Sequence, residues 1–123
     1  MASRTILVVE DHLLNRELVV DLLEAAGYTV LQAQDGSGLL ELLKAERPDL
    51  IILDLQLPDV DGFTLAQQLS VDPETRGIPV LAMSAYAMPP EQQRAKAAGC
   101  VDFLPKPFDT RKLVETVARL AWR

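Results

Sequence analysis

The sequence predicts an α/β fold in which a parallel β-sheet lies between two layers of helices. Short apolar runs alternate with longer segments of helical periodicity along all 123 residues. Three of these runs are nearly uninterrupted, which is typical of parallel strands that are covered on both faces. The alternation occurs five times, so we expect five βα units joined by right-handed crossovers.

The predicted strands are the apolar runs at residues 6–9, 28–33, 50–53, 80–83 and 101–104. Parallel sheets of this size commonly have the strand order 2-1-3-4-5 of flavodoxin-like folds, and we predict this order, although periodicity alone does not prove it. In that order strands 1 and 3 are neighbours at the topological switch point. Ligands of such sheets bind there, outside the carboxyl ends of the strands.

The segments between the strands show the apolar stripes of amphipathic helices. The first helix ends at Gly27, and we assign its buried face to Leu14, Leu18, Leu22 and Ala26. Stripes with the same spacing mark the buried sides of the second, third and fifth helices. Their members are Leu39, Leu40 and Leu43; Leu65, Ala66 and Leu69; and Leu113, Val114, Val117, Leu120 and Ala121.

Proline, glycine and acidic residues mark the other helix ends. Pro48 follows the second helix and breaks it. The fourth helix begins near the Pro-Pro pair at 89–90, with Glu91 in its first turn, and it ends at Gly99. Asp109 is the expected N-cap of the last helix.

The composition indicates one ordinary globular domain, and we expect residues 1–123 to form it. The chain is 49% hydrophobic and 24% charged, without repeats or low-complexity tracts. A net charge of −6 argues against nucleic-acid binding, which needs a basic surface. The sequence has a single cysteine, Cys100, no signal peptide and no apolar run of membrane-spanning length. We therefore expect a cytoplasmic protein.

Polar residues follow four of the predicted strands at their carboxyl ends. Glu10 and Asp11 follow the first strand, Asp54 the third, Ser84 the fourth and Lys106 the fifth. Adjacent strands lie about 4.8 Å apart. We therefore expect the carboxylates after strands 1 and 3 to face each other across one strand spacing.

Three carboxylates at this distance raise one another's pKa unless a cation neutralises them. Mg²⁺ is the natural cation, because it binds one or two carboxylates together with water and a phosphate. Ser84 and Lys106 add a hydroxyl and an ammonium to the same edge. This combination is typical of a phosphoryl-transfer site in which Asp54 is the nucleophile.

Four segments of the chain resemble the receiver domain of bacterial two-component response regulators, in the CheY-like superfamily. They are ILVVEDH (6–12), LIILDLQLPDVDG (50–62), VLAMSA (80–85) and FLPKPF (103–108), and the resemblance spans essentially the whole chain. It implies a phosphorelay protein that accepts a phosphoryl group from a histidine kinase or histidine phosphotransferase. The phosphorylated form then binds a downstream protein partner through the face made by helix 4, strand 5 and helix 5.

The resemblance also implies roles for single residues at the sheet edge. Glu10 and Asp11 match the acidic pair that holds Mg²⁺, together with Asp54 and the backbone carbonyl of Gln56. Asp54 matches the phosphoacceptor. Lys106 matches the lysine that pairs with the phosphoryl group. Such a domain is not an enzyme in the usual sense, because it catalyses only its own phosphorylation and dephosphorylation.

Further positions match the switch residues of the family. Ser84 matches the hydroxyl residue that turns toward the phosphoryl group, and Ala85 the small residue that leaves room for it. Phe103 stands where the family keeps a switch aromatic. A cis peptide bond is usual before the proline that Pro107 matches.

Three residues depart from the commonest pattern of the family. Ser84 replaces threonine, so the hydroxyl is kept but the methyl that restricts its rotamer is lost. Phe103 replaces tyrosine and has no hydroxyl for a hydrogen bond. Glu10 replaces aspartate, and we expect its longer side chain to reach the metal through water. The flanking sequences resemble stand-alone receivers and those of hybrid kinases, without deciding whether the chain acts alone or within a longer protein.

Other functions fit the residues less well. A haloacid-dehalogenase-like phosphatase needs a second aspartate two residues after the nucleophile, where this chain has Gln56. Flavin or dinucleotide binding needs a phosphate-binding loop after strand 1, but the segment EDHLLN is acidic. A receiver that signals by docking without phosphorylation has the same fold, although such proteins usually lose an acid or the lysine. The sequence leaves this last alternative open. We expect a monomer or a weak dimer.

Several reactive side chains outside this set have ordinary structural interpretations. Asp59 and Asp61 are spaced as in a calcium loop but lack its closing glutamate, so we interpret them as turn formers. His12 is expected to be exposed, because one histidine does not make a metal site. Cys100 is expected to be partly buried and inert. Trp122 is expected to pack at the end of the last helix or to lie in an interface.

Overall fold

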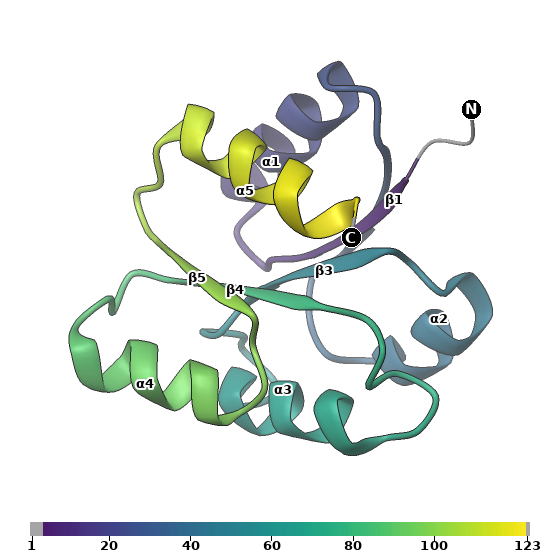
Figure 1. The fold of residues 1–123 in the computed structure, drawn as a ribbon, viewed down its shortest axis with the longest axis vertical. Coiled ribbons are helices and arrows are strands. Elements are labelled where there is room, and N and C mark those ends of the chain that lie inside the picture. The colour runs from purple at the N-terminus through teal and green to yellow at the C-terminus, as the bar shows by residue number, and fades with distance from the viewer. Residues whose placement is uncertain (1–3, 123) are drawn as a thin grey trace.

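A computed structural model describes residues 4–122 and contains a five-stranded parallel sheet in the order β2-β1-β3-β4-β5 (Figure 1). Neighbouring strands are parallel throughout. The predicted strand order is therefore confirmed. The strands are β1 (Thr5–Val9), β2 (Thr29–Ala33), β3 (Leu50–Asp54), β4 (Val80–Ser84) and β5 (Asp102–Pro105).

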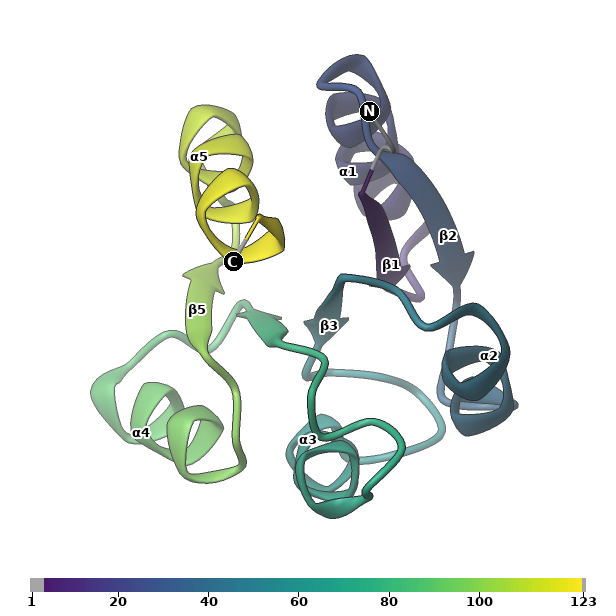
Figure 2. The same ribbon diagram turned by 45° about the vertical axis from the view of Figure 1, so that its right-hand side comes forward.

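Helices cover the two faces of the sheet in separate layers. Helices α1 and α5 lie side by side on one face, whereas α2, α3 and α4 cover the other (Figures 1 and 2). This is the predicted doubly wound, flavodoxin-like arrangement. The helices are α1 (Leu13–Ala25), α2 (Leu39–Glu46), α3 (Gly62–Val71), α4 (Pro89–Ala97) and α5 (Thr110–Ala121).

The core divides into two apolar clusters, one on each face of the sheet. Alternate residues of a strand point to opposite faces. In β1, Ile6 and Val8 therefore pack under α1 and α5, while Leu7 and Val9 pack under α2 and α3. Strand β3 is buried along its whole length. The continuous apolar runs in the sequence follow from this burial on both faces.

The buried face of α1 differs from the predicted one. Val19, Val20 and Leu23 face the core, whereas Leu14 is 69% exposed and Leu18 is 44% exposed. Helix α1 carries apolar residues on more than one side, so its sequence offers two stripes of similar quality. The sheet and α5 cover only one of them. The predicted stripe was wrong at Leu14, at Leu18 and at Ala26, which is also exposed and follows the last residue of α1; only Leu22 is half-buried against the core.

Smaller differences concern the ends of strands and two half-buried positions. Strand β2 begins at Thr29 rather than at residue 28, and β5 runs one residue later than predicted, because Val101 is exposed. Leu40 and Val114 lie at the margins of their stripes and are only half-buried. The other predicted apolar positions of α2, α3 and α5 are buried.

The predicted helix ends have identifiable physical causes. Gly27 and Gly99 follow α1 and α4 with φ of +98° and +101°, in the left-handed region where only glycine is unstrained. The Asp109 carboxylate accepts hydrogen bonds from the backbone N–H groups of Arg111 and Lys112 at the start of α5. Asp109 is thus the N-cap that the sequence predicts.

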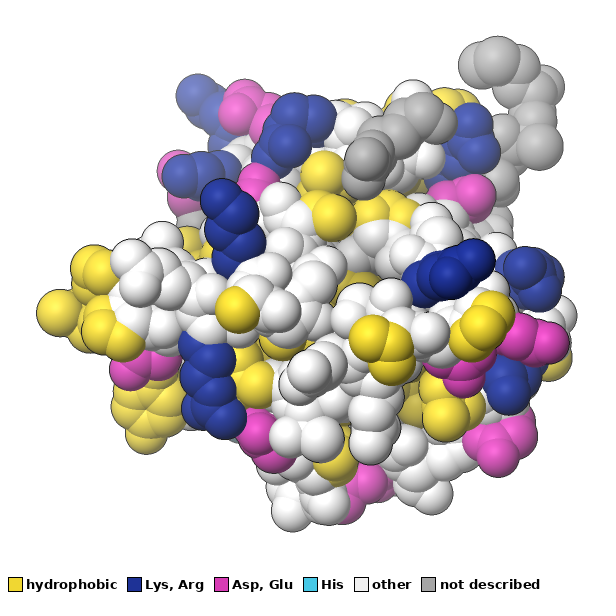
Figure 3. Space-filling view, turned by 60° about the horizontal axis from the view of Figure 1, so that its bottom comes forward, with side chains coloured by type: hydrophobic (Ala, Val, Ile, Leu, Met, Phe, Trp, Pro, Cys, Tyr) yellow, Lys and Arg dark blue, Asp and Glu magenta, His cyan; other side chains and the backbone are white. Residues whose placement is uncertain are grey.

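The surface formed by α2, α3 and α4 carries both signs of charge. Figure 3 shows Lys and Arg side chains interspersed with Asp and Glu side chains over this layer, among uncharged polar atoms. A continuous basic area is not seen in this view. Within residues 4–122, no helix combines the length and the apolar character that crossing a membrane requires.

Candidate functional site

The register of the sheet brings the ends of β1 and β3 together. Val9 pairs with Leu53, so the residues that follow them, Glu10 and Asp54, stand next to each other at the carboxyl edge. Both carboxylates are buried, with exposed side-chain fractions of 0% and 2%. Asp11 follows on the open side of the edge and is exposed.

The three acids form the cluster that the sequence predicts. One carboxylate oxygen from each of Glu10, Asp11 and Asp54 can be chosen so that all three lie within 4.8 Å of one another. Oxygen atoms converging at this spacing are suited to a hard divalent cation such as Mg²⁺. The exposed Asp11 lies at the solvent side of the two buried acids, where a hydrated ion has access. The residues present therefore fit a metal ion.

Lys106 contacts both buried carboxylates from the loop after β5. Its Nζ donates to Oε1 of Glu10 at 2.7 Å and to Oδ2 of Asp54 at 2.9 Å. The ammonium is largely buried, with 15% of the side chain exposed. The Lys106–Pro107 peptide bond is cis.

Burial and shared hydrogen bonds shift the pKa values of this cluster in different directions. Burial, together with the Asp54 carboxylate, raises the pKa of Glu10 to about 7. Burial alone would also raise the pKa of Asp54, but hydrogen bonds from Glu10, the Gln56 backbone and Lys106 lower it. Burial opposes the charged form of Lys106, yet the two carboxylates raise its pKa above the usual value.

These shifts describe two coupled carboxyl groups beside one ammonium. Because the pKa of Glu10 is raised to about 7 and that of Asp54 is lowered, Glu10 is the carboxyl of the pair that binds a proton first as the pH falls. A divalent cation that binds at the cluster takes the place of the proton, because both stabilise the same negative charge. The surroundings thus favour the ionised form of the buried Asp54 carboxylate.

Ser84 lies at the end of β4, beside Asp54. Residues Asp54 and Met83 are paired across β3 and β4, and Ser84 is one residue further along. Its hydroxyl is buried, accepts from the Tyr86 backbone N–H at 3.0 Å and donates to Oε1 of Gln56 at 3.4 Å. The Gln56 backbone N–H donates to Oδ1 of Asp54 at 2.9 Å.

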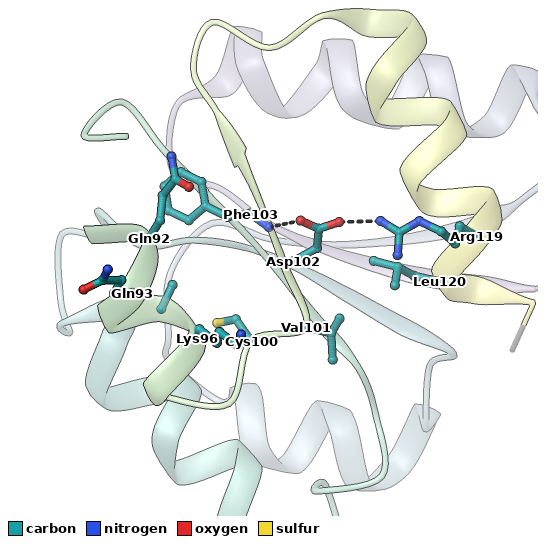
Figure 4. A pocket seen from close by; sticks show the side chains of 10 residues that line it. Gln92, Gln93, Lys96, Cys100, Val101, Asp102, Phe103, Arg119 and Leu120 are labelled. Carbon is teal, nitrogen blue, oxygen red and sulfur yellow. Dashed lines mark hydrogen bonds and ion pairs between the residues drawn. The ribbon is translucent and has the colours of Figure 1, made fainter. Parts of the chain in front are cut away.

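Phe103 lies in β5, away from the acidic cluster. Its half-buried ring packs on the side of the sheet covered by α4 (Figure 4). It lines a cavity of about 770 Å³ between α4, β5 and α5, which is lined also by Gln92, Lys96 and Cys100. On the other side of this cavity Arg119 forms an ion pair with Asp102 (Figure 4).

The structure gives ordinary roles to the residues that the sequence analysis set aside. Asp61 caps α3 and accepts from Thr64 Oγ1 at 3.0 Å, while Asp59 accepts from the Gly36 backbone N–H. Asp61 is thus the N-cap of α3, whereas Asp59 joins its loop to the loop at Gly36 rather than closing a turn of its own. His12 is exposed. Cys100 is more deeply buried than expected, and burial raises the pKa of its thiol to about 11.

Trp122 packs at the end of the last helix, which is the first of the two positions predicted for it. Its indole N–H donates to the Tyr28 hydroxyl at 3.2 Å, and the Arg4 guanidinium lies 4.7 Å from its ring centre. The side chain is still 47% exposed.

The structure brings Glu10, Asp11, Asp54, Ser84 and Lys106 to one edge of the sheet, as the sequence predicts. The sequence pattern predicts a role for Gln56 only through its backbone carbonyl. The structure adds its side chain, which reaches across to β4. Because Gln56 lies two residues after Asp54, the sequence indicates that it is close to Asp54. The sequence does not indicate in which direction its side chain points.

This fold and this edge define a class of signalling protein. The family model described as the response regulator receiver domain matches residues 6–118, and the chain belongs to this family. Receiver domains of two-component systems are signalling proteins, and the resemblance noted in the sequence is confirmed.

Individual relatives support this assignment. The chain is 39% identical over 114 residues to the polar-differentiation response regulator DivK of Brucella anthropi, covering 93% of each chain. The chemotaxis response regulator CheY4 of Vibrio cholerae has a similar structure, with a TM-score of 0.89, 30% identity and coverage of 97% and 99%. The receiver domain of the sensor histidine kinase PA1611 of Pseudomonas aeruginosa, with a magnesium ion coordinated in its active site cleft, reaches a TM-score of 0.89 at 29% identity, with coverage of 99% and 100%.

Proposed function

We propose that Asp54 accepts a phosphoryl group from a histidine kinase or histidine phosphotransferase in an Mg²⁺-dependent reaction. The observation that carries this proposal is the buried Asp54 carboxylate, whose pKa is lowered and which lies 2.9 Å from the Lys106 ammonium beside two further acids. Of the relatives, DivK is a response regulator and the PA1611 receiver holds magnesium, which supports both parts of the proposal.

In the proposed reaction a carboxylate oxygen of Asp54 attacks the phosphorus of the donor phosphohistidine. An O–P bond forms, the P–N bond breaks, and its electron pair stays on the imidazole nitrogen of the donor. Lys106 offsets the charge on the oxygens of the transferred group. Glu10, Asp11, Asp54 and the backbone carbonyl of Gln56 would hold Mg²⁺, which when bound supplies further positive charge to these oxygens.

The output of the reaction is a shift between two conformations. We propose that the phosphoryl group draws the Ser84 hydroxyl toward it, and that Phe103 then moves into the space released beside β4. This repacks the face formed by α4, β5 and α5, which binds the downstream protein partner. To change the ratio of two states from about 1:99 to 99:1, phosphorylation must favour one by about 5.5 kcal/mol. New charge-assisted hydrogen bonds from Ser84 and Lys106 are a sufficient source.

Residues 1–123 act in this proposal as one receiver domain in the cytoplasm, as a monomer or weak dimer. Its chemistry is confined to its own carboxylate: it catalyses its own phosphorylation and the hydrolysis that reverses it. Receivers that dock without being phosphorylated are the remaining alternative. The retention of all three acids and of Lys106 favours the phosphorylated type.

Intact mass measurement after incubation with acetyl phosphate and Mg²⁺ tests the proposal. We expect one phosphoryl adduct, stable to acid and labile to base, which is absent in Asp54→Asn and in the presence of EDTA. An unmodified wild-type chain under conditions where Mg²⁺ binds would contradict the proposal and favour signalling by docking alone.

A further inference from the structure

Two hydrogen-bond donors at the end of β4 converge on a single acceptor. The Ala85 backbone N–H donates to Oε1 of Gln56 at 3.0 Å, and the Ser84 hydroxyl approaches the same oxygen at 3.4 Å. The acceptor comes from the loop between β3 and α3, which follows Asp54 directly. One side chain thus connects the loop of the proposed phosphoacceptor to the loop between β4 and α4.

Two contacts hold the backbone of Gln56 in place. Its N–H donates to Oδ1 of Asp54 at 2.9 Å, and Gln56 forms an isolated β-bridge with Asp61. The loop closes tightly where Gly62 meets Leu55: a Cβ on Gly62 would lie 2.4 Å from the Cα of Leu55. The exposed Gln56 side chain therefore extends from a fixed backbone toward the end of β4, where it makes these two contacts.

The two donors lie at the end of β4, the strand next to β3, which ends at Asp54. Ser84 follows the residue paired with Asp54 across the sheet, and Ala85 is next in the chain. A hydroxyl has one hydrogen to donate, and so has a backbone amide. Neither donor can serve the Gln56 oxygen and a phosphoryl oxygen at the same time with full strength.

We infer that the Gln56 side chain is a positioning residue that keeps the Ser84 hydroxyl and the Ala85 N–H engaged until a phosphoryl group on Asp54 replaces it. Its carbonyl oxygen occupies, in the unphosphorylated receiver, the acceptor position that a phosphoryl oxygen takes afterwards. The inference rests on the proposed function. It assigns to Gln56 a control over the rate and extent of activation that is separate from its backbone role toward a metal.

The exchange of acceptors is favourable overall but has a barrier. A phosphoryl oxygen is a charged acceptor, and charge-assisted hydrogen bonds are roughly twice as strong as neutral ones. The bonds to Gln56 must nevertheless lengthen before the new ones form. Removing the Gln56 acceptor should therefore populate the receptive arrangement of Ser84 and Ala85 before phosphorylation.

Gln56→Met tests this inference, because methionine has similar length and no strong acceptor. We expect it to raise the initial rate of adduct formation from acetyl phosphate at saturating Mg²⁺ by roughly three- to ten-fold, the factor that one neutral hydrogen bond typically supplies. Gln56→Glu keeps an acceptor at the same reach and should not exceed the wild-type rate. Gln67→Met, at an exposed position on α3, is the matched control and should leave the rate unchanged.

A second readout separates positioning from a general structural effect. The backbone amide of Ala85 should shift upfield in the ¹H–¹⁵N spectrum of unphosphorylated Gln56→Met. In Gln56→Glu it should stay at its wild-type position or move downfield, because a charged acceptor makes the stronger hydrogen bond. This measurement needs no phosphorylation. A wild-type chain that forms no adduct would therefore contradict the proposed function, while the Ala85 shift would still report on the contact.

Two results would overturn the inference about Gln56. One is a wild-type rate in Gln56→Met at saturating Mg²⁺. The other is an unchanged Ala85 amide in that variant, whatever its rate, because the effect would then not pass through this contact. A faster rate together with a shifted Ala85 amide supports it.

Discussion

Two groups of charged side chains in this protein are built in opposite ways. The Lys106 cluster, formed by Lys106, Glu10 and Asp54, lies at the carboxyl edge of the sheet, and its two carboxylates are 0% and 2% exposed. The ion pair between Arg119 and Asp102 lies beside α5, where the two side chains are 60% and 37% exposed. Both groups have short contacts between opposite charges, yet they differ in their surroundings.

The difference shows that burial decides how strongly an ion pair affects the stability of the fold and the pKa values of its members. Water and salt screen the exposed pair, so it contributes little to stability. The Lys106 cluster is desolvated, carries two carboxylates for one ammonium, and shifts the pKa values of all its members. A buried cluster with excess negative charge stabilises the fold poorly, and this imbalance suits a site that binds a cation.

The largest expected effect follows from removing the ammonium of the buried cluster. Lys106→Met leaves Glu10 and Asp54 buried without a cation, and we expect a loss of about 3–5 kcal/mol in the free energy of unfolding at pH 8 without Mg²⁺. Urea unfolding measures it, with Lys106→Arg as the control that keeps the charge. A loss below about 1 kcal/mol would mean that the cluster is as well solvated as the exposed pair.

The second prediction concerns pH. Because the pKa of Glu10 is raised to about 7 in the folded protein, the folded state binds more protons than the unfolded state between the usual carboxyl range and neutrality. Stability without metal should therefore fall as the pH rises from 5 to 8, on the order of 2–3 kcal/mol. The lowered pKa of Asp54 acts oppositely, but only below pH 4.

Urea unfolding across this pH range measures the effect. Glu10→Gln should flatten the profile, and saturating Mg²⁺ should oppose the fall because metal binding requires the deprotonated acids. A profile in Glu10→Gln as steep as that of the wild type would assign the titration to another group.

A smaller effect is expected from Arg94, which joins α4 to α3. Its guanidinium lies 4.1 Å from the ring centre of Phe63 and 3.4 Å from a carboxylate oxygen of Asp61, and both contacts are exposed. Arg94→Gln should lower the free energy of unfolding by about 1 kcal/mol, since each contact contributes less than that. Lys96→Gln on the same helix is the matched control and should change stability by less.

The smallest effect should come from the exposed pair itself. Arg119→Gln should lower the free energy of unfolding by about 0.2–1 kcal/mol at low salt. The loss should shrink further in 0.5 M NaCl, because salt screens exposed charges. A loss above about 2 kcal/mol that persists in salt would contradict the contrast drawn between the two groups of charges.

Much of the fold could be predicted because its signals are local. The continuous apolar run at 50–53 requires burial on both faces, and this requirement identifies a central parallel strand. Gly27, Gly99 and Asp109 end or begin helices through their own backbone preferences. Because parallel strands end at the same edge, the polar residues that follow them were predicted to meet there, and they do.

Features that depend on competition between similar alternatives could not be predicted. Helix α1 has two apolar stripes, and only its packing against the sheet and α5 selects Val19, Val20 and Leu23 over Leu14 and Leu18. Local periodicity has no information about which stripe is covered, because that depends on neighbours distant in the sequence.

The sequence by itself determined the order of elements and the set of acids, hydroxyl and lysine at one edge. These follow from hydrophobic periodicity and from the geometry of parallel sheets, which act over a few residues. Only the tertiary structure decided that Lys106 bonds to both Glu10 and Asp54, and that the Gln56 side chain accepts from Ala85. The direction of a polar side chain depends on which partners the whole fold brings within hydrogen-bond distance, and at this edge those partners come from four different strands.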